Sequence, residues 1–288
     1  MNQNPSFEII ECGVDWITAT AKHKQSIRRL WNEGHRQIQN ETRQGNEKRL
    51  WSFNGYQGFK SGSVQLGRRA DGVCVRLSGG FANEKWRRIF EQCDNVSRLD
   101  LQVTVKTSGD PIREIGRVYR EASKHSRKLK RGPTVSTFRT SRGSSTVYLG
   151  SRQSDNFGRC YDKERESGLD YYQGCVRFER EVKNDLALHL CAALYEELAP
   201  TPFILAQVGK WYLNRGVSHR WSGQSPLFIK SPARATDSSR QLRWIRSAVA
   251  PTVARLIARG LHAEVLDALN LRRTASGHAA VLRLKKTA

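Results

Sequence analysis

The sequence predicts an α+β fold followed by a basic helical region. In the first two hundred residues, segments with alternating apolar and polar residues are interspersed with segments whose apolar residues recur at i, i+3 and i+4. The charge also changes near Pro200 and Pro202: residues 201–288 hold 15 Lys and Arg against 3 Asp and Glu, whereas residues 1–200 hold 34 against 24. We therefore expect a sheet-and-helix domain over 1–200 and a basic, mostly helical DNA-binding region over 201–288.

The first half of the chain reads as strands with two intervening helices. Glycines in the segment 48–78 indicate hairpin turns between several short strands. Asn83 is expected to cap a helix whose apolar face includes Trp86 and Ile89. The predicted elements are a strand over 9–20, a helix over 26–40, the short strands of 48–78, the helix after Asn83 and a strand over 98–106.

A second group of elements begins at Asp110-Pro111, which predicts a helix N-cap followed by proline in the first turn. The basic segments 123–132 and 136–145 are expected to be loops, either solvated or in contact with phosphates. The remaining predictions are a strand over 175–183, a helix over about 185–198, and helices over 240–259 and 262–271.

Net charge indicates the kind of partner. The chain has a formal charge of +22 and a pI near 10.3, which favours polyanions and above all nucleic acid. A membrane-surface role is disfavoured, because no apolar run approaches ~18 residues and the polar first residues do not resemble a signal peptide. A ribosomal-type structural role is disfavoured by a hydrophobic content of 38%, which is enough for a substantial core.

Cysteine spacing predicts no zinc site. The six cysteines are scattered, without a CxxC pair or a Cys/His spacing suited to zinc. We expect reduced, mostly buried thiols in a cytoplasm.

Two predicted strands carry acidic residues on their polar faces. In RLDLQVTV, alternation separates Asp100 from the apolar residues, and in CVRFEREVK it does the same for Glu179 and Glu181. If the strands are neighbours, these carboxylates would form a set of hard oxygen ligands for Mg²⁺ or Mn²⁺. The alternative is that Arg98 and Arg177 neutralise the acids in a cross-strand ion-pair ladder.

Tyr161 is the candidate nucleophile. A strand through FGRCYDK would place Phe157, Arg159, Tyr161 and Lys163 on one face, with two cations beside the phenol. Nearby cations stabilise a phenolate and the charge that develops on an attacked phosphate. The alternative is a buried structural tyrosine, while Tyr171 and Tyr172 compete as nucleophiles beside a glycine-bounded turn.

Other catalytic templates are absent from the sequence. It contains no GxSxG, no GxxxxGK[ST] and no HExxH motif. The seven histidines are scattered, and no two are separated by a single hydrophobic residue as in the best-known tyrosine nickases. A P-loop helicase or packaging ATPase is therefore disfavoured.

Five segments together resemble the replication initiation factor family. These Rep_trans-type proteins initiate rolling-circle replication of plasmids and filamentous phages, and MobT-type conjugative relaxases are similar to them. The resemblance covers roughly residues 9–185 and depends most on the block that contains Tyr161. The segments are VDWITAT (14–20), RLSGG (76–80), SRLDLQVTV (97–105), VYLGSRQSDNFGRCYDK (147–163) and VRFERE (176–181).

The resemblance implies a DNA nickase with a metal-bearing antiparallel sheet, similar to the histidine-type nickases but with carboxylates in place of their histidine pair. Tyr161 would attack the origin, form a 5′-phosphotyrosyl link and leave a 3′-hydroxyl primer. Asp100 and Glu179, and less directly Glu181, would hold Mg²⁺ or Mn²⁺, with Asp15 supporting the site. The implied partners are origin DNA, a host helicase and a host polymerase; a homodimer is left open.

Cations would bind the DNA in this scheme. Arg159 and Lys163 would assist the tyrosine, and Arg152 would hold phosphate oxygens. The expected further DNA contacts are the basic residues after the Asp110 helix, namely Lys124, Arg127, Lys128, Lys130 and Arg131. A conjugative relaxase and a non-enzymatic DNA-binding protein or repressor stay open as alternatives.

Overall fold

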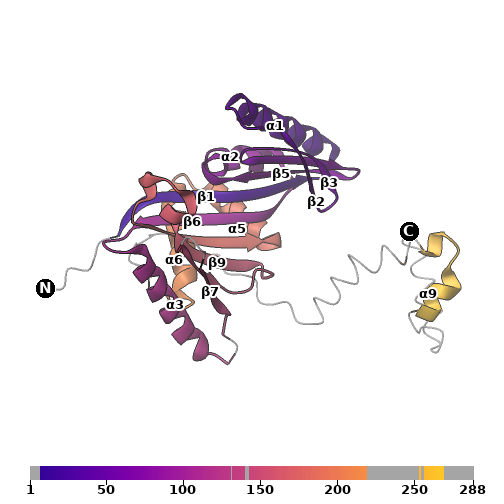
Figure 1. Ribbon diagram of the computed structural model, residues 1–288. Helices are drawn as coiled ribbons and strands as arrows, with labels where there is room; N and C mark the ends of the chain where they lie inside the picture. The colour runs from indigo at the N-terminus through magenta and orange to yellow at the C-terminus, as the bar shows by residue number, and fades with distance from the viewer. Residues whose placement is uncertain (1–6, 131, 140–142, 219–252, 254–255, 269–288) are drawn as a thin grey trace. The chain divides into compact units, whose positions relative to one another are not determined.

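One antiparallel sheet of ten strands organises the chain (Figure 1). The computed structural model describes residues 7–130, 132–139, 143–218, 253 and 256–268. Across the sheet the strands are β2 (Arg49–Phe53), β3 (Tyr56–Ser61), β4 (Val64–Arg69), β5 (Gly72–Ser78), β1 (Glu8–Ala21), β6 (Asn95–Lys106), β10 (Cys175–Lys183), β9 (Asn156–Asp162), β8 (Ser145–Leu149) and β7 (Val135–Arg139). The helices and the large antiparallel sheet confirm the α+β part of the predicted fold class.

The helices pack on the apolar face of this sheet. Leu99, Leu101, Val103 and Val105 of β6 are fully buried there, as strand alternation predicts. A Cβ added to Gly34 would meet Leu66 and Val75, so the sheet and the helix approach closely at this point. The helices are α1 (Lys24–Arg43), α2 (Gly79–Gln92), α3 (Pro111–Arg127), α5 (Asn184–Glu196) and α6 (Pro200–Leu213).

Helix α6, beyond residue 200, packs on the sheet. Its Trp211 lies against Gly158 of β9, and the ring of Tyr212 packs edge-on against Phe178 of β10 at 5.2 Å. The chain forms two compact units, Met1–Ser231 and Pro232–Ala288. In the second unit the structure describes a helix, α9 (His262–Ala268), within the predicted 262–271; the predicted helix over 240–259 lies almost wholly outside the described residues.

Several local predictions were wrong for identifiable reasons. Helix α2 starts at Gly79, and Asn83 lies inside it, where its side chain accepts a hydrogen bond from the Val14 amide at 3.0 Å instead of capping the helix. Gly58 and Gly67 lie within strands, where neighbouring atoms leave no room for a Cβ. Helix α3 continues to Arg127, and β7 and β8 take up parts of the expected loop 136–145. The Asp110 N-cap is confirmed by its hydrogen bond from the Ile112 amide at 2.9 Å.

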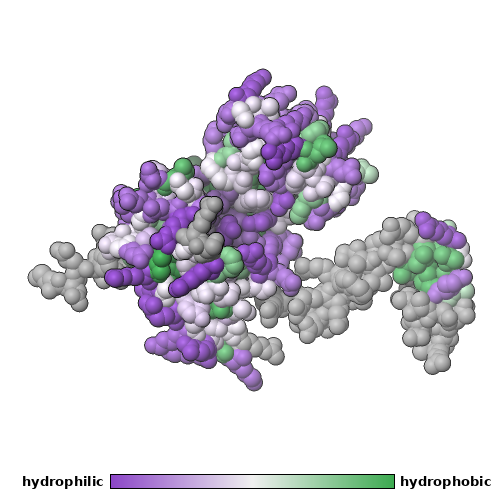
Figure 2. Space-filling model, viewed as in Figure 1, coloured by the Kyte–Doolittle hydropathy of each residue, from purple (hydrophilic) through white to green (hydrophobic). Residues whose placement is uncertain are grey.

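Surface polarity agrees with the basic composition. Figure 2 shows mostly hydrophilic residues over the visible face of the first unit, with hydrophobic residues in small separate patches. Among the residues that the structure describes, no helix is long and apolar enough to cross a membrane.

Candidate active site

The polar face of strands β6, β10 and β9 brings the predicted site residues together. In one row across the three strands, Asp100 of β6 pairs with Glu181 of β10, and Glu181 pairs with Phe157 of β9. In the next row on the same face, Glu179 of β10 pairs with Arg159 of β9. Tyr161 pairs with Arg177, on the same face. Tyr161, Glu179 and Asp100 thus share one face of the sheet. Tyr161 is the diagonal neighbour of Glu179, whereas the row that contains Asp100 is two rows away from the row that contains Tyr161.

Tyr161 is bonded directly to a carboxylate. Its side chain is 7% exposed, and its hydroxyl donates a hydrogen bond to Oε1 of Glu179. Burial, followed by the negative charge of Glu179, raises the pKa of Tyr161 far above its usual range. The phenol is therefore protonated at neutral pH, and any attack by its oxygen requires a group to accept the proton.

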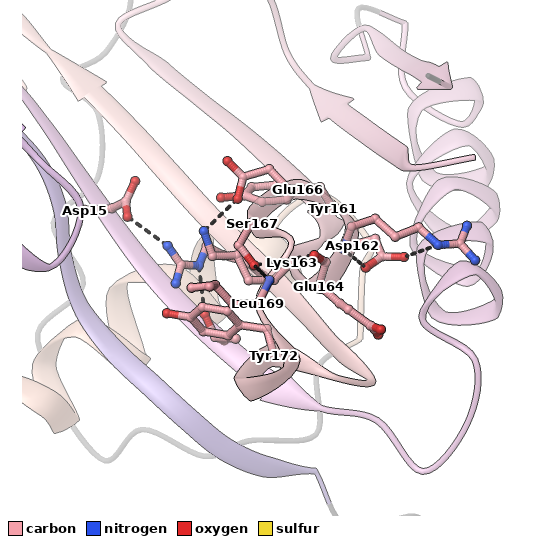
Figure 3. Close-up of polar contacts among 12 residues, drawn as sticks. Asp15, Tyr161, Asp162, Lys163, Glu164, Glu166, Ser167, Leu169 and Tyr172 are labelled. Carbon is pink, nitrogen blue, oxygen red and sulfur yellow. Dashed lines mark hydrogen bonds and ion pairs between the residues drawn. The ribbon is translucent and has the colours of Figure 1, made fainter. Parts of the chain in front are cut away.

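Two cations lie beside the phenol and its carboxylate. Arg159 forms an ion pair with Oε2 of Glu179, and its guanidinium lies 5.6 Å from the centre of the Tyr161 ring. Lys163 begins helix α4 (Lys163–Ser167) rather than continuing β9, because Asp162 caps that helix through the Arg165 amide at 3.1 Å. Even so, Lys163 Nζ lies 6.0 Å from the Tyr161 ring centre, and Figure 3 shows the two side chains beside each other.

Asp100 belongs to a second ion-pair group. Its two carboxylate oxygens accept from Arg98 Nε at 2.9 Å and Nη2 at 2.5 Å. Arg98 also binds Glu181 at 2.8 Å, and Lys183 binds the other oxygen of Glu181 at 2.7 Å. The expected pairing of Arg98 with the acids is therefore present.

The three carboxylates match Mg²⁺ or Mn²⁺ in donor type but not in arrangement. Every oxygen of Asp100, Glu179 and Glu181 already accepts from an arginine, a lysine or Tyr161. Within the described ranges, no three His, Cys, Asp or Glu side chains are grouped so that they could hold a metal ion. A divalent ion at these residues would have to replace arginine contacts.

Arg177 forms a network that the sequence did not indicate. It binds Asp15 at 2.8 Å, Thr104 at 2.8 Å and also Glu11 (Figure 3 shows the Asp15 contact). The alternative of a cross-strand ladder in which Arg177 neutralises Asp100, Glu179 or Glu181 does not hold for this arginine, because it pairs with Glu11 and Asp15, while Arg159 pairs with Glu179. Burial of Arg177, 3% exposed, is the reason that it needs these partners.

Tyr172 lies close to the same network. It belongs to a single 3₁₀ turn, η1 (Asp170–Tyr172), and its hydroxyl donates to Glu11 at 3.0 Å. Lys163 Nζ lies 5.2 Å from the Tyr172 ring centre, whereas the Tyr171 side chain is exposed. Tyr172 is therefore the nearer of the two competing tyrosines, held by Glu11 rather than by Glu179.

The predicted DNA-binding residues lie in two places. Arg152 follows β8, with its guanidinium 4.6 Å from the ring centre of Tyr148, a residue that pairs with Arg159. Lys124 and Arg127 are on α3 and line a cavity of about 740 Å³ between that helix and β7. Lys128 and Lys130 follow the helix, whereas Arg131 lies outside the described residues. The α3 residues thus belong to the helix-covered side of the sheet, apart from Tyr161.

The raised pKa values of two buried acids predict a pH dependence of stability. Burial raises the pKa of Asp100 to about 6, against the opposing effect of Arg98; burial and the charge of Asp15 raise that of Glu179 to about 7, against Arg159. Between pH ~4 and ~7 the native state then binds more protons than the unfolded chain, so the free energy of unfolding falls as pH rises.

We expect Glu179→Gln to make the free energy of unfolding fall less steeply as pH rises. Thermal unfolding in EDTA between pH 5 and 7.5 measures it. The Tm of the wild-type chain should decrease with pH more steeply than that of the variant, and parallel profiles would contradict the assigned pKa. Glu166→Gln, at an exposed ion pair with Lys163, is the matched control.

Comparison with known proteins gives the family. The model of the replication initiation factor family matches residues 95–266, which is more than half of the chain. This protein belongs to the replication initiation factor family. The matched residues start at β6, so they include Asp100, Tyr161 and Glu179, but not the segments VDWITAT and RLSGG.

A solved structure supports the family fold. The rolling circle replication initiator protein from Geobacillus stearothermophilus is similar with a TM-score of 0.51 and 19% identity, over 80% of this chain and 91% of that chain. At this identity the similarity concerns the fold. No curated protein matches the chain. As a replication initiation factor, the protein has DNA as its implied partner.

Proposed function

We propose that this replication initiation factor nicks one strand of a rolling-circle origin with Tyr161. The observation that carries the proposal is the hydrogen bond from the Tyr161 hydroxyl to Glu179, beside the cations Arg159 and Lys163. A protonated, buried tyrosine with a carboxylate acceptor has the two groups that attack on a phosphodiester needs.

The reaction is a transesterification at phosphorus. Glu179 takes the phenolic proton as the Tyr161 oxygen forms a bond to the scissile phosphorus, and the bond from phosphorus to the 3′ oxygen breaks. The departing 3′ oxygen takes a proton from water, so the products are a 5′-phosphotyrosyl link and a 3′-hydroxyl, which primes a host polymerase. The energy of the broken bond is retained in the link, so the reverse reaction rejoins ends without ATP.

The cations supply charge stabilisation. Arg159 and Lys163 lie beside the Tyr161 ring, where they would face the non-bridging oxygens of a bound phosphate. Donors placed before the reaction lower the free energy of the transition state without reorganisation. Arg152, next to Tyr148, would extend the contact to a neighbouring phosphate.

A divalent ion is a separate part of the proposal. We propose that Mg²⁺ or Mn²⁺ binds at Asp100, Glu181 and Oε2 of Glu179 when Arg98 and Arg159 turn from the carboxylates to DNA phosphates, which leaves Oε1 of Glu179 to accept the Tyr161 proton. Both arginine side chains are partly exposed, at 24% and 35%, and so have room to turn. When bound, such an ion would polarise a phosphate oxygen.

Metal binding predicts a ligand-dependent rise in stability. In the presence of an oligonucleotide, Mn²⁺ should raise the Tm of Tyr161→Phe, because an ion that binds only the native state stabilises it. The rise should disappear in the same background when Asp100→Asn is added, and it should persist with Glu166→Gln. An equal rise in all three proteins would remove these carboxylates from metal binding.

Two alternatives have distinct outcomes. A conjugative relaxase would use the same chemistry on a transfer origin, so incubation with each type of supercoiled DNA separates it from a replication initiator. A non-enzymatic repressor would bind the origin without nicking it. The test is the appearance, on cognate supercoiled DNA with Mn²⁺ or Mg²⁺, of open-circular DNA and a detergent-stable protein–DNA adduct; their absence would overturn the nickase proposal.

A further inference from the structure

A row of cations crosses the sheet on the face that carries Tyr161. Directly paired residues follow one another from β2 to β10, and paired residues of an antiparallel sheet point to the same face. The row consists of Arg49, Lys60, Gln65, Arg76, Thr18, Arg98 and Lys183, so five of its seven members are cationic. It spans seven strands, or roughly 29 Å at ~4.8 Å per strand.

Aromatic rings surround one member of this row. The guanidinium of Arg76 lies 4.0 Å from the ring centre of Phe53, 5.0 Å from that of Trp16 and 5.9 Å from that of Trp51. Trp51 and Phe53 are stacked at 6.0 Å with an angle of 18° between their planes. We call Trp16, Trp51, Phe53 and Arg76 the aromatic platform; all four are partly exposed.

The Trp51 ring packs over Gly67, and its partner on the neighbouring strand is also a glycine. A Cβ added to Gly67 would lie 2.6 Å from the Trp51 ring, and Trp51 itself pairs with Gly58. Trp51 and Leu50 point to opposite faces of the sheet, and Leu50 pairs with Phe59 on the apolar face. The rings are therefore held on the polar face of the sheet, away from α1 and α2.

Arg76 differs from the other arginines on this face. Arg98, Arg159 and Arg177 each form an ion pair with a carboxylate. Arg76 donates to Gln65 at 3.3 Å, and its buried Nε has no hydrogen-bond partner among the described residues. No described carboxylate lies within ion-pair distance of it either, so the platform has a cation with unused hydrogen-bonding capacity.

We propose that the aromatic platform and the cation row bind single-stranded DNA leading to the nick site. Bases would stack on Trp51 and Phe53, and phosphates would contact Arg76 and Arg98. Aromatic rings interleaved with cations bind unstacked bases of any sequence, because every base has a flat face. A duplex, whose bases are stacked on each other, offers the rings no such face. The position of the nick relative to the bound strand rests on the proposed function, whereas binding of the single strand does not.

The test measures binding without cleavage. Full-length protein carrying Tyr161→Phe is titrated into a labelled single-stranded oligonucleotide and into its duplex, with fluorescence anisotropy as the readout. Trp51→Ala and Arg76→Gln should each raise the Kd for the single strand about tenfold and leave the duplex Kd nearly unchanged. Trp51→Phe, which keeps a ring, should restore most of the affinity.

Leu50→Ala is the matched control, because Leu50 is on the same strand, points to the opposite face and is 89% exposed. It should bind as the parent does. Unchanged single-strand affinity in both Trp51→Ala and Arg76→Gln, or an equal loss for duplex, would overturn the platform. If adduct formation fails in the wild type while these binding differences appear, the nicking proposal fails and the platform stands.

Discussion

Tyr161→Phe should eliminate adduct formation and lower the rate of nicking by about 10³-fold or more, because it removes the attacking oxygen. The ring stays, and the buried Glu179 keeps its ion pair with Arg159, so the fold should be retained. The assay follows conversion of supercoiled origin DNA to open circles and to a detergent-stable complex.

Tyr172→Phe is the control for this prediction. Tyr172 lies near the same lysine but donates to Glu11 rather than Glu179. It should nick and form the adduct within a few-fold of the wild type, with about tenfold as the largest loss that a positioning contact of one hydrogen bond explains. A full loss in Tyr172→Phe together with activity in Tyr161→Phe would exchange their roles.

Glu179→Gln should reduce nicking by about 10²- to 10⁴-fold, the range for loss of a general base. The amide cannot accept the phenolic proton as a carboxylate does, and burial of Tyr161 leaves it fully protonated at neutral pH. Single-turnover nicking across a range of pH measures the effect. The wild-type rate should rise with pH as the carboxylate ionises, and this rise should be absent in the variant.

Glu181→Gln provides the comparison. Glu181 is on the same strand and face but pairs with Arg98 and Lys183 instead of the tyrosine. It should keep the pH-dependent rise that Glu179→Gln loses. If both variants lose the same factor and the same pH dependence, Glu179 has no special role as proton acceptor.

Strand alternation could predict which face of its own strand each candidate site residue lies on. Alternation alone placed Asp100 on one face of its strand, and Glu179 and Glu181 on one face of theirs, and the register confirms that all three share a face. The same alternation predicted that Tyr161 lies on a strand and shares a face with Phe157 and Arg159, and β9 has this arrangement. These assignments depend only on local sequence.

The pairing of charges could not be predicted, because it depends on register between strands that are far apart in the chain. Arg177 binds Glu11 and Asp15, across 166 and 162 residues, instead of the acids beside it. The alternation pattern also extended the Tyr161 strand through Lys163, where an Asp162 cap starts a helix. The platform was missed because its members come from three strands that are far apart in the chain, β1, β2 and β5, and meet only around Arg76.

Mapping the DNA-linked residue tests the central claim most directly. The wild-type protein is incubated with origin DNA and Mn²⁺, the adduct is digested with protease and nuclease, and the nucleotide-bearing peptide is sequenced by mass spectrometry. The account predicts a nucleotide 5′-phosphate on Tyr161, in the peptide that contains Cys160 and Asp162. A nucleotide on Tyr171, Tyr172 or any other side chain would contradict it.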